Sequence, residues 1–380
     1  MDAFSSTNAL ALPDSRNWSD CQMGAPPRLS VVIVNYQSWE DTARLVQQLQ
    51  QSAALYLGQA EIVIVDNNSL PHPLIGWLRR ASGVSLRRWR SNKGFARAAN
   101  EGCRLSQGEW ILLLNPDTSV EVGFLDEVLE RIDQQEADVG VIGFRLLNSD
   151  GSPQLSTGVY PQFLTSLARL LLPRHCRKYT RPQQLDACEV DWVTGCCLLA
   201  RRTCLQQLGG LDSEFFLYYE DVDLCRRARA AGWSVWFDPT LSVIHHQPIH
   251  SRRVPAHIRL VTRHALLTYA RKHWPEWQFR LLGVLIDLES RWRQGAAWWQ
   301  GATRTSQIFG ELQRLTGHLL SGHTRAARAT LLEVIRDEEV HRARLHNNRH
   351  CSPQPTRSAS SLSGQRQPTS STEHASAGGR

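Results

Sequence analysis

Short apolar runs that alternate with helix-like segments dominate the first third of this chain of 380 residues. Two of them, LSVVIVNY (29–36) and EIVIVDNNS (61–69), are rich in valine and isoleucine and end in polar residues. Continuous branched runs of this length suit strands that are buried on both faces of a parallel sheet. GVSLRRWR (83–90) and EWILLLNPDT (109–118) continue the series, and helical patterns lie between them. The alternation predicts an α/β fold of right-handed βαβ units with helices on both faces of the sheet.

The sequence predicts four regions. They are a loose polar leader (1–27), an α/β domain (28–252), a helical extension (253–345) and a disordered tail (346–380). The tail is rich in Ser, Pro, Gly and Gln and has too few apolar residues to form a core. Late in the α/β domain we expect a strand at 196–202, a helix at 221–231, and two separate short strands at 233–237 and 241–246.

Composition limits the location of the protein. No stretch reaches the roughly 18 apolar residues that span a bilayer, and the N-terminus lacks a basic start followed by an apolar core. The nine cysteines include no C-x-x-C pair, so we expect free thiols in a reducing compartment. These features predict a cytoplasmic protein.

Positive charge is concentrated in residues 251–350, which hold 17 Arg and Lys but only 8 Asp and Glu. Five of the 13 tryptophans lie in the same segment. Basic residues mixed with tryptophan suit the surface of an anionic membrane, and they also suit RNA. A solvated helical surface over a Trp-rich core explains the pattern equally well.

Polar clusters end three of the predicted strands: Asn35-Tyr36, Asp66-Asn67-Asn68-Ser69 and Asn115-Pro116-Asp117-Thr118. Ligands of an open α/β sheet bind outside the carboxyl ends of its strands. Any one cluster is explained by a helix cap or a turn. Three clusters on one edge favour a ligand site.

A possible phosphate contact is Asn92-Lys93-Gly94, which directly precedes a predicted helix. A glycine allows close backbone approach, and a helix N-terminus favours negative charge. The segment is neither a P-loop nor a G-x-G-x-x-G fingerprint, so it is a weak signal when taken alone.

The densest group of carboxylates is Glu220, Asp221 and Asp223, at the start of a predicted helix. We expect Asp223 to pair with Arg227 one turn later, and we interpret Asp221 as a catalytic base. His245 ends a short apolar strand and is followed by His246. An imidazole there, together with Asp117, would leave room on Mg²⁺ or Mn²⁺ for diphosphate oxygens and water.

These segments together resemble the family 2 glycosyltransferases of the GT-A fold, in particular the bacterial rhamnosyltransferase-like branch. The matching stretches appear in the family's order over about residues 29–250. They are VVIVNYQSWEDT, IVIVDNNS, SNKGFARAANEG, WILLLNPDT, DWVTGCCLLARR, GGLDSEFFLYYEDVDLCRRARAAGW and VIHH. The resemblance implies a mixed, mainly parallel GT-A sheet flanked by helices.

The resemblance also implies roles at matching positions. The nucleotide-binding residues are Asn35, Tyr36, Asp66, Asn68, Asn92, Gly94 and Asn115. The metal ligands are Asp117 and His245, the base is Asp221, and the acceptor residues are Trp192, Thr194, Gly195 and Glu220. Asn115-Pro116-Asp117 lacks the first carboxylate of the family's D-x-D motif, and Gln247-Pro248-Ile249-His250 departs from its usual glycine-containing loop.

The function implied is inverting transfer of a sugar from a nucleotide diphosphate to a glycan or lipid-linked hydroxyl, in the synthesis of cell-surface polysaccharide. dTDP-rhamnose is the donor suggested by the branch, peripheral membrane contact is expected, and nucleic acid is not expected as a partner.

Two alternatives stay open. One is a nucleotidyltransferase, although such enzymes carry a Gly-rich basic loop where this chain has Asn35-Tyr36-Gln37-Ser38. The other is a catalytically silent scaffold protein.

Overall fold

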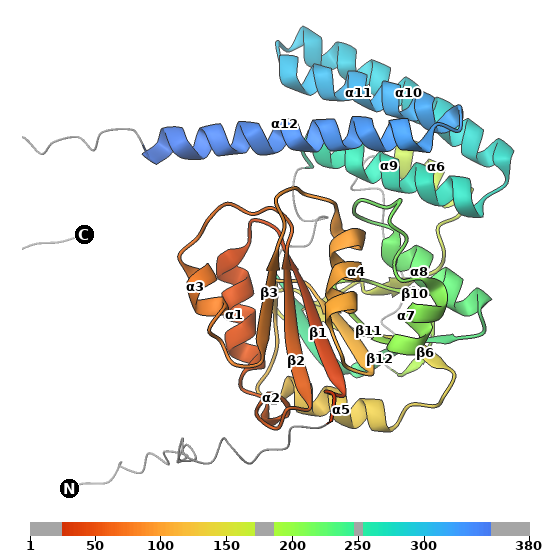
Figure 1. Cartoon of the computed structure of the whole chain (residues 1–380). Helices are drawn as coiled ribbons and strands as arrows, with labels where there is room; N and C mark the ends of the chain where they lie inside the picture. Colours follow the sequence, from red (N-terminus) through yellow and green to blue (C-terminus); the bar gives the residue numbers. More distant parts are fainter. Residues whose placement is uncertain (1–24, 172–185, 247–253, 351–380) are drawn as a thin grey trace, which may run out of the picture. The chain divides into compact units, whose positions relative to one another are not determined.

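The computed structural model describes residues 25–171, 186–246 and 254–350 (Figure 1). Most of the predicted leader (1–27) and most of the predicted disordered tail (346–380) therefore lie outside the described residues. The chain divides into two compact units, residues 1–339 and 340–380.

The strands in chain order are β1 (Leu29–Asn35), β2 (Ala60–Asp66), β3 (Val84–Arg88), β4 (Trp110–Leu114), β5 (Thr118–Ser119), β6 (Val139–Leu147), β7 (Pro153–Gln154), β8 (Thr157–Gly158), β9 (Cys188–Glu189), β10 (Trp192–Val193), β11 (Cys197–Arg201) and β12 (Ser234–His245). The helices are α1 (Trp39–Leu49), α2 (Ala53–Tyr56), α3 (Leu74–Leu78), α4 (Phe95–Leu105), α5 (Phe124–Asp133), α6 (Phe163–Leu171), α7 (Arg202–Leu208), α8 (Glu220–Ala230), α9 (Ala256–His273), α10 (Glu276–Trp299), α11 (Thr303–Leu320) and α12 (Thr324–His350).

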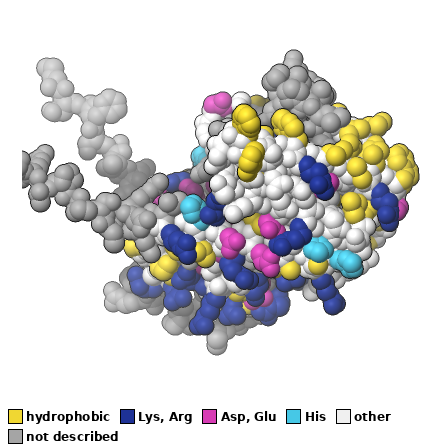
Figure 2. Space-filling view, turned by 90° about the horizontal axis from the view of Figure 1, so that it is seen from above, with side chains coloured by type: hydrophobic (Ala, Val, Ile, Leu, Met, Phe, Trp, Pro, Cys, Tyr) yellow, Lys and Arg dark blue, Asp and Glu magenta, His cyan; other side chains and the backbone are white. Residues whose placement is uncertain are grey.

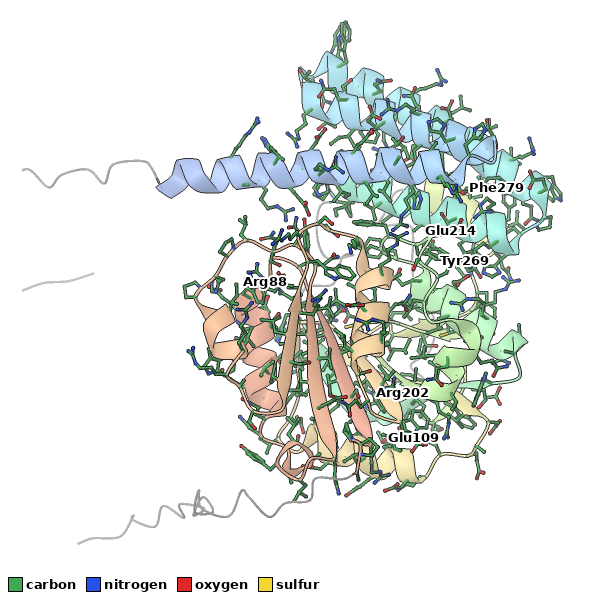
Figure 3. All side chains as sticks on the ribbon, viewed as in Figure 1. Arg88, Glu109, Arg202, Glu214, Tyr269 and Phe279 are labelled. Atoms are coloured by element: carbon green, nitrogen blue, oxygen red, sulfur yellow. The ribbon has the colours of Figure 1, made fainter. Side chains whose placement is uncertain are left out.

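The main sheet has the strand order β3-β2-β1-β4-β11-β6-β12-β5. Strands β3, β2, β1 and β4 are parallel to one another, whereas β11 runs antiparallel to both β4 and β6. The sheet is therefore mixed, and its parallel half confirms the predicted βαβ series. In Figure 3, Arg88 marks the carboxyl end of this half, and Glu109, which precedes β4, marks the amino end.

Alternate residues of the central strands supply two separate hydrophobic cores. Val31 and Ile33 of β1 pack with α1 and α5 on one face, whereas Val32 and Val34 pack with α4, α7 and α8 on the other. Since side chains in a strand alternate between faces, a strand that is apolar at every position needs helices on both sides. Figure 1 shows α1 and α4 on opposite sides of the sheet.

Strand β12 corrects one expectation. The two short strands predicted at 233–237 and 241–246 are one strand, Ser234–His245, whose pairing register with β6 shifts between Asp238 and Ser242. Pro239 lies inside this irregularity, and Asp238 Oδ1 accepts a bond from the Thr240 amide at 2.8 Å. A proline without an N–H and an Asx turn interrupt the sequence pattern, but the chain resumes pairing beyond them.

The helical character expected beyond residue 253 is confirmed by α9, α10, α11 and α12. Their inward faces share a core that includes Leu267 of α9, Leu282 of α10, Leu312 of α11 and Leu331 of α12. Among the described residues, no helix is long and apolar enough to cross a membrane.

Candidate functional site

The carboxyl ends of β1 and β2 meet at Asn35 and Asp66, which are direct partners in the parallel ladder. Both side chains are fully buried. Asp66 Oδ1 accepts bonds from Asn35 Nδ2 at 2.9 Å and from the Ser69 amide at 3.2 Å, and Oδ2 accepts one from Arg88 Nε at 2.9 Å. Asn35 Oδ1 accepts a bond from the Thr42 hydroxyl at 2.9 Å. These two residues therefore hold the ends of β1 and β2 together in a polar cluster beneath the surface.

More accessible polar groups, those of Tyr36 and Asn68, lie directly beside this cluster. The Tyr36 hydroxyl and Asn68 Nδ2 each donate a bond of 3.0 Å to one carboxylate oxygen of Glu339 in α12. Asn68 has a φ of 73° and neighbouring Gln37 a φ of 58°, values in the left-handed region that non-glycine residues rarely adopt. The predicted nucleotide site thus includes a residue that follows it by about 270 positions.

The segment Asn92–Gly94 forms a tight turn before α4. Asn92 Oδ1 accepts bonds from Asn67 Nδ2 at 2.8 Å and from the Gly94 amide at 3.0 Å. Gly94 has a φ of 90°, and a Cβ added to it would lie 2.6 Å from the carbonyl oxygen of Phe216. The Phe95 amide, at the N-terminus of α4, already donates to that carbonyl. The close approach that requires a glycine here is therefore to Phe216.

Asp117 and His245 come together through the pairing of β5 with β12, which sets His245 opposite Thr118. His245 Nε2 lies 3.5 Å from Asp117 Oδ1, and both side chains are largely buried. His245 Nδ1 lies 3.0 Å from Gln154 Oε1, and an Nδ1–H donated to that oxygen leaves the Nε2 lone pair toward Asp117. An imidazole fixed in this way beside a carboxylate is a donor set that suits Mn²⁺ or Mg²⁺.

The neighbouring His246 has a different environment. Its Nε2 lies 2.7 Å from the Ser119 hydroxyl, and its Nδ1 lies 3.0 Å from the Ser149 hydroxyl. Both ring nitrogens are thus engaged, so His245 is the better candidate ligand of the two. Within residues 25–171, 186–246 and 254–350, no group of three or more His, Cys, Asp or Glu side chains could hold a metal. A cation here would depend on oxygens from a ligand.

Asp221 lies in the first turn of α8 and turns toward the start of β11. Its Oδ2 accepts a bond from the Gly195 amide at 2.8 Å, and its Oδ1 accepts one from the Val222 amide at 2.8 Å. Burial raises the pKa of the Asp221 carboxyl above its ordinary value, although these amides and the Thr194 hydroxyl offset part of the effect. A carboxylate held in this way is an effective proton acceptor.

The Cys196 thiol, in the residue that follows Gly195, is buried. Burial raises its pKa well above the ordinary value, and the charges of Cys197, Asp117 and Asp221 add to the effect. The Asn115 amide donates to the Cys196 carbonyl at 2.9 Å. This bond joins the end of β4, which Asp117 follows in the chain, to the start of β11, which Gly195 precedes.

Glu220 is buried beside Asp221, and its Oε2 has no hydrogen-bond partner among the described residues. Burial, reinforced by the charge of Asp221, raises the pKa of Glu220 well above its ordinary value. The shift favours the protonated form of this carboxyl. Tyr218 and Tyr219, which precede it, have φ values of 73° and 68°. Backbone strain of about 1–3 kcal/mol per residue therefore adjoins the proposed base.

Asp223 anchors α8, and the expected pair with Arg227 is confirmed at 2.7 Å. Two residues of α9 also contact Asp223, because Lys272 Nζ lies 2.7 Å and His273 Nε2 lies 2.8 Å from its Oδ1. His273, Arg227 and Lys272 overcome the effect of burial and lower the pKa of Asp223 to about 2. The helical extension thereby holds the helix that carries Asp221.

The predicted acceptor residues Trp192, Thr194 and Gly195 lie on β10 and the loop that follows it. Trp192 Nε1 donates to the Val159 carbonyl at 2.9 Å, and the Thr194 amide donates to the Ser156 carbonyl at 2.9 Å. These two bonds fix the loop, and the Gly195 amide in it donates to Asp221.

Sequence reasoning missed three contributions to this site: Glu339, the Arg88 side chain on Asp66, and the strained pair Tyr218-Tyr219. Arg88 had a weak signal, because it ends a strand next to the polar clusters. The contact of Glu339 with Tyr36 and Asn68 depends on tertiary packing and leaves no local pattern.

Residues 30–209 match the family model described as Glycosyl transferase family 2. The chain is 27% identical over 276 residues to N-acetylglucosaminyl-diphospho-decaprenol L-rhamnosyltransferase of Mycobacterium tuberculosis, over 68% of this chain and 89% of that protein. It is 28% identical over 240 residues to the low-salt glycan biosynthesis hexosyltransferase Agl10 of Haloferax volcanii, over 59% of this chain and 69% of that protein.

A search of solved structures finds the mannosyltransferase PcManGT from Pyrobaculum calidifontis, in complex with GDP-Man and Mn²⁺. The match has 13% sequence identity and a TM-score of 0.45, and it covers 82% of this chain and 88% of the other.

Proposed function

We propose that the chain is a rhamnosyltransferase-like glycosyltransferase of family 2 with a GT-A fold, and that it inverts the anomeric centre of the sugar it transfers. The match to this family favours sugar transfer over the nucleotidyltransferase and the silent scaffold. The observation that supports the inverting mechanism is the Asp221 carboxylate, which accepts a bond of 2.8 Å from the Gly195 amide. A retaining enzyme needs a carboxylate nucleophile as well as an acid/base group.

In the proposed reaction, Asp221 accepts the proton of an acceptor hydroxyl while that oxygen bonds to the anomeric carbon. The bond from this carbon to the diphosphate oxygen breaks on the opposite face, and the nucleoside diphosphate leaves with the electron pair. The raised pKa of Asp221 brings its proton affinity nearer to that of a useful general base. The Gly195 and Val222 amides orient the carboxylate.

Asp117 and His245 would hold a divalent cation, Mn²⁺ or Mg²⁺, and Gln154 fixes the ring of His245. Such a cation neutralises negative charge on a departing diphosphate. With only two side-chain ligands, its affinity should depend on the oxygens of the nucleotide.

We assign binding of the nucleotide base to Tyr36, Asn68 and Arg88, above the buried pair Asn35 and Asp66. The buried pair has its hydrogen bonds satisfied internally, so it supports this surface and does not itself contact the base. Asn92 and Asn115 lie in adjoining turns and would line the ribose and diphosphate. dTDP-rhamnose is the donor we propose, on the strength of the relative named a rhamnosyltransferase.

The acceptor we propose is a lipid-linked glycan, because helix α10 carries an exposed apolar stripe. Its members recur at intervals of three, four or, for the last pair, seven residues along the helix: Trp277, Leu281, Val284, Leu288, Trp292 and Trp299, each between 42% and 85% exposed. Figure 2 shows hydrophobic side chains gathered in a patch that Lys and Arg side chains border. Ion pairs such as Asp287–Arg291 line the flank of the helix. Apolar stripes with terminal tryptophans suit the interface of a bilayer.

Vesicle flotation tests the membrane contact. We expect the full chain to float with vesicles that contain anionic lipid, and the double substitution Leu288→Glu with Trp292→Glu to reduce flotation by about tenfold or more. Val122→Glu is the matched control, because Val122 is 71% exposed outside the helical extension. Equal flotation of all three proteins would contradict membrane docking through α10.

The proposed reaction is tested by thermal shift with a panel of nucleotide sugars, with and without Mn²⁺, followed by NMR of the transferred sugar. A matching donor stabilises the folded state by mass action, and we expect Mn²⁺ to enlarge its shift. The product should have the anomeric configuration opposite to that of the donor. A product with retained configuration would overturn the mechanism.

A further inference from the structure

A cavity of about 300 Å³, whose lining does not include Asp117 or Asp221, lies where α9, α11 and α12 meet the segment 212–214. Its lining includes Arg97 of α4, Arg271 of α9, and Arg325 and Arg328 of α12. Figure 3 labels Glu214, which lies on this side of the sheet domain below α9. Four guanidinium groups around one small cavity need a source of negative charge.

The carboxylates in the lining are already paired. Glu214 pairs with Arg271, and Asp212 pairs with Lys272. Within the described part of the chain, no ion pair joins Arg97, Arg325 or Arg328 to a carboxylate. The lining therefore holds four guanidinium groups against two carboxylates, an excess of two positive charges.

Arg328 is the most confined of these arginines. Its guanidinium donates to backbone carbonyls, including those of Glu214 and of Lys93 at 3.2 Å each, and no carboxylate among the described residues bonds to it directly. Burial, with the charge of Arg97, lowers the pKa of Arg328 to about 10. In the described structure its Nε has no hydrogen-bond partner.

His264 provides independent evidence for a polar ligand in this cavity. The side chain is 3% exposed, it lines the cavity, and its Nδ1 has no hydrogen-bond partner among the described residues. An unmet buried polar group costs about 1–3 kcal/mol. Burial together with Arg328 and Arg271 lowers the pKa of His264 to about 4, so the ring is neutral at pH 7. A neutral ring can donate Nδ1–H to an anion.

We propose that this cavity is a binding site for a phosphate group, held by Arg97, Arg325 and Arg328 and by the Nδ1–H of His264. Guanidinium groups match the oxygens of phosphate in both charge and geometry. The first turn of α12 at Thr324 and Arg325 also faces the cavity, and a helix N-terminus adds partial positive charge. Thr268, buried in the same lining, supplies a hydroxyl.

A series of contacts connects this cavity to the proposed donor site. Arg328 bonds the carbonyl of Lys93, which precedes Gly94, and Gly94 packs on Phe216 ahead of the proposed base. A phosphate on Arg328 would stiffen this connection. The phosphate has two sources, a free ion or the headgroup of a lipid, and both present the same terminal oxygens.

Histidine-selective NMR of the full chain tests the proposal, with His264→Asn used to assign the signal of His264. We expect inorganic phosphate to move this signal along a saturable curve at constant ionic strength and pH 7. A short-chain phosphatidic acid below its micelle concentration is the second arm. Tighter binding of the lipid assigns the site to a headgroup, and equal or weaker binding assigns it to the free ion.

Arg97 and Arg325 are exposed, so their joint replacement by glutamine should leave the fold intact. That double variant should weaken both ligands at least tenfold, as loss of two charge-assisted contacts predicts. Arg336→Gln is the matched control, because Arg336 is an exposed arginine of α12 outside the cavity. An unmoved His264 signal with both probes, or unchanged affinity in the double variant, would overturn the proposal. The readout is independent of sugar transfer, so it stands apart from the proposed reaction.

Discussion

His245 Nε2 lies 3.5 Å from Asp117 Oδ1, with Gln154 on the far side of the imidazole ring. The pairing of β5 with β12 joins these residues from distant parts of the chain. The arrangement differs from that of His246, whose two ring nitrogens contact serine hydroxyls. The two adjacent histidines thus have different environments, and that of His245 suits the metal ligand implied by the resemblance.

The first prediction concerns this difference. His245→Gln should remove most of the stabilisation that Mn²⁺ adds to a bound nucleotide sugar, whereas His246→Gln should keep it. Gln154→Leu should weaken the apparent affinity for Mn²⁺ about 10–100-fold, because the outer partner of a metal-binding histidine sets its orientation. Titration of Mn²⁺ by thermal shift measures all three. The assignment fails if His246→Gln shows the larger loss.

The second prediction concerns Glu339, which bonds Tyr36 and Asn68. Glu339→Ala should raise KM for the donor about fivefold with little change in kcat, since a typical hydrogen bond contributes about 1 kcal/mol and we propose that Tyr36 and Asn68 bind the nucleotide base. Glu333→Ala is the control, because Glu333 is exposed on the same helix and pairs only with Arg314 among the described residues. Steady-state kinetics separates the two parameters, and equal KM values in both variants would contradict the role.

The third prediction concerns Gly94. Gly94→Ala places a Cβ 2.6 Å from the Phe216 carbonyl oxygen at a φ of 90°, so it should destabilise the fold by at least about 2 kcal/mol. Gly58→Ala is a matched control with a φ of 68° and open space around the Cβ, and it should pay only the conformational cost. Urea denaturation compares them. Equal losses would mean that the contact with Phe216 carries no strain.

The fourth prediction concerns pH. The folded pKa of Glu220 lies well above 4.5, so above pH 4.5 the unfolded chain binds fewer protons at this residue than the folded chain. Glu220 therefore opposes folding progressively as pH rises. Glu220→Gln should gain stability relative to the unsubstituted protein as pH rises from 4.5, whereas the exposed Glu130→Gln should not. A stability difference that stays constant as pH rises would refute a raised pKa at Glu220.

The sequence was sufficient for features that depend on local pattern. Runs such as LSVVIVN determine a strand buried on both faces, and carboxylates four residues from arginines determine pairs such as Asp223–Arg227. The clusters at Asn35 and Asp66 were recognisable because parallel strands end at one edge. Their structural role could not be predicted, because only the structure shows that both side chains are fully buried.

Other features depend on tertiary contacts. The sequence split β12 at Asp238-Pro239 because a proline usually ends a strand, yet its pairing with β6 continues after a register shift. Lys272 and His273 reach Asp223 from α9, and no spacing in the sequence relates them. The left-handed φ values of Tyr218 and Tyr219 are likewise set by packing around α8, and tyrosine gives no hint of them.

The most direct test of the account is the turnover of Asp221→Asn under saturating donor. An amide at this position keeps the shape but cannot accept the proton, so we expect kcat to fall by about 10²–10⁴-fold. Donor affinity, measured by thermal shift, should stay within about twofold. Asp221 bonds to the Gly195 and Val222 amides and is not among the residues that we assign to the nucleotide base. Undiminished turnover in this variant would show that Asp221 is not the base.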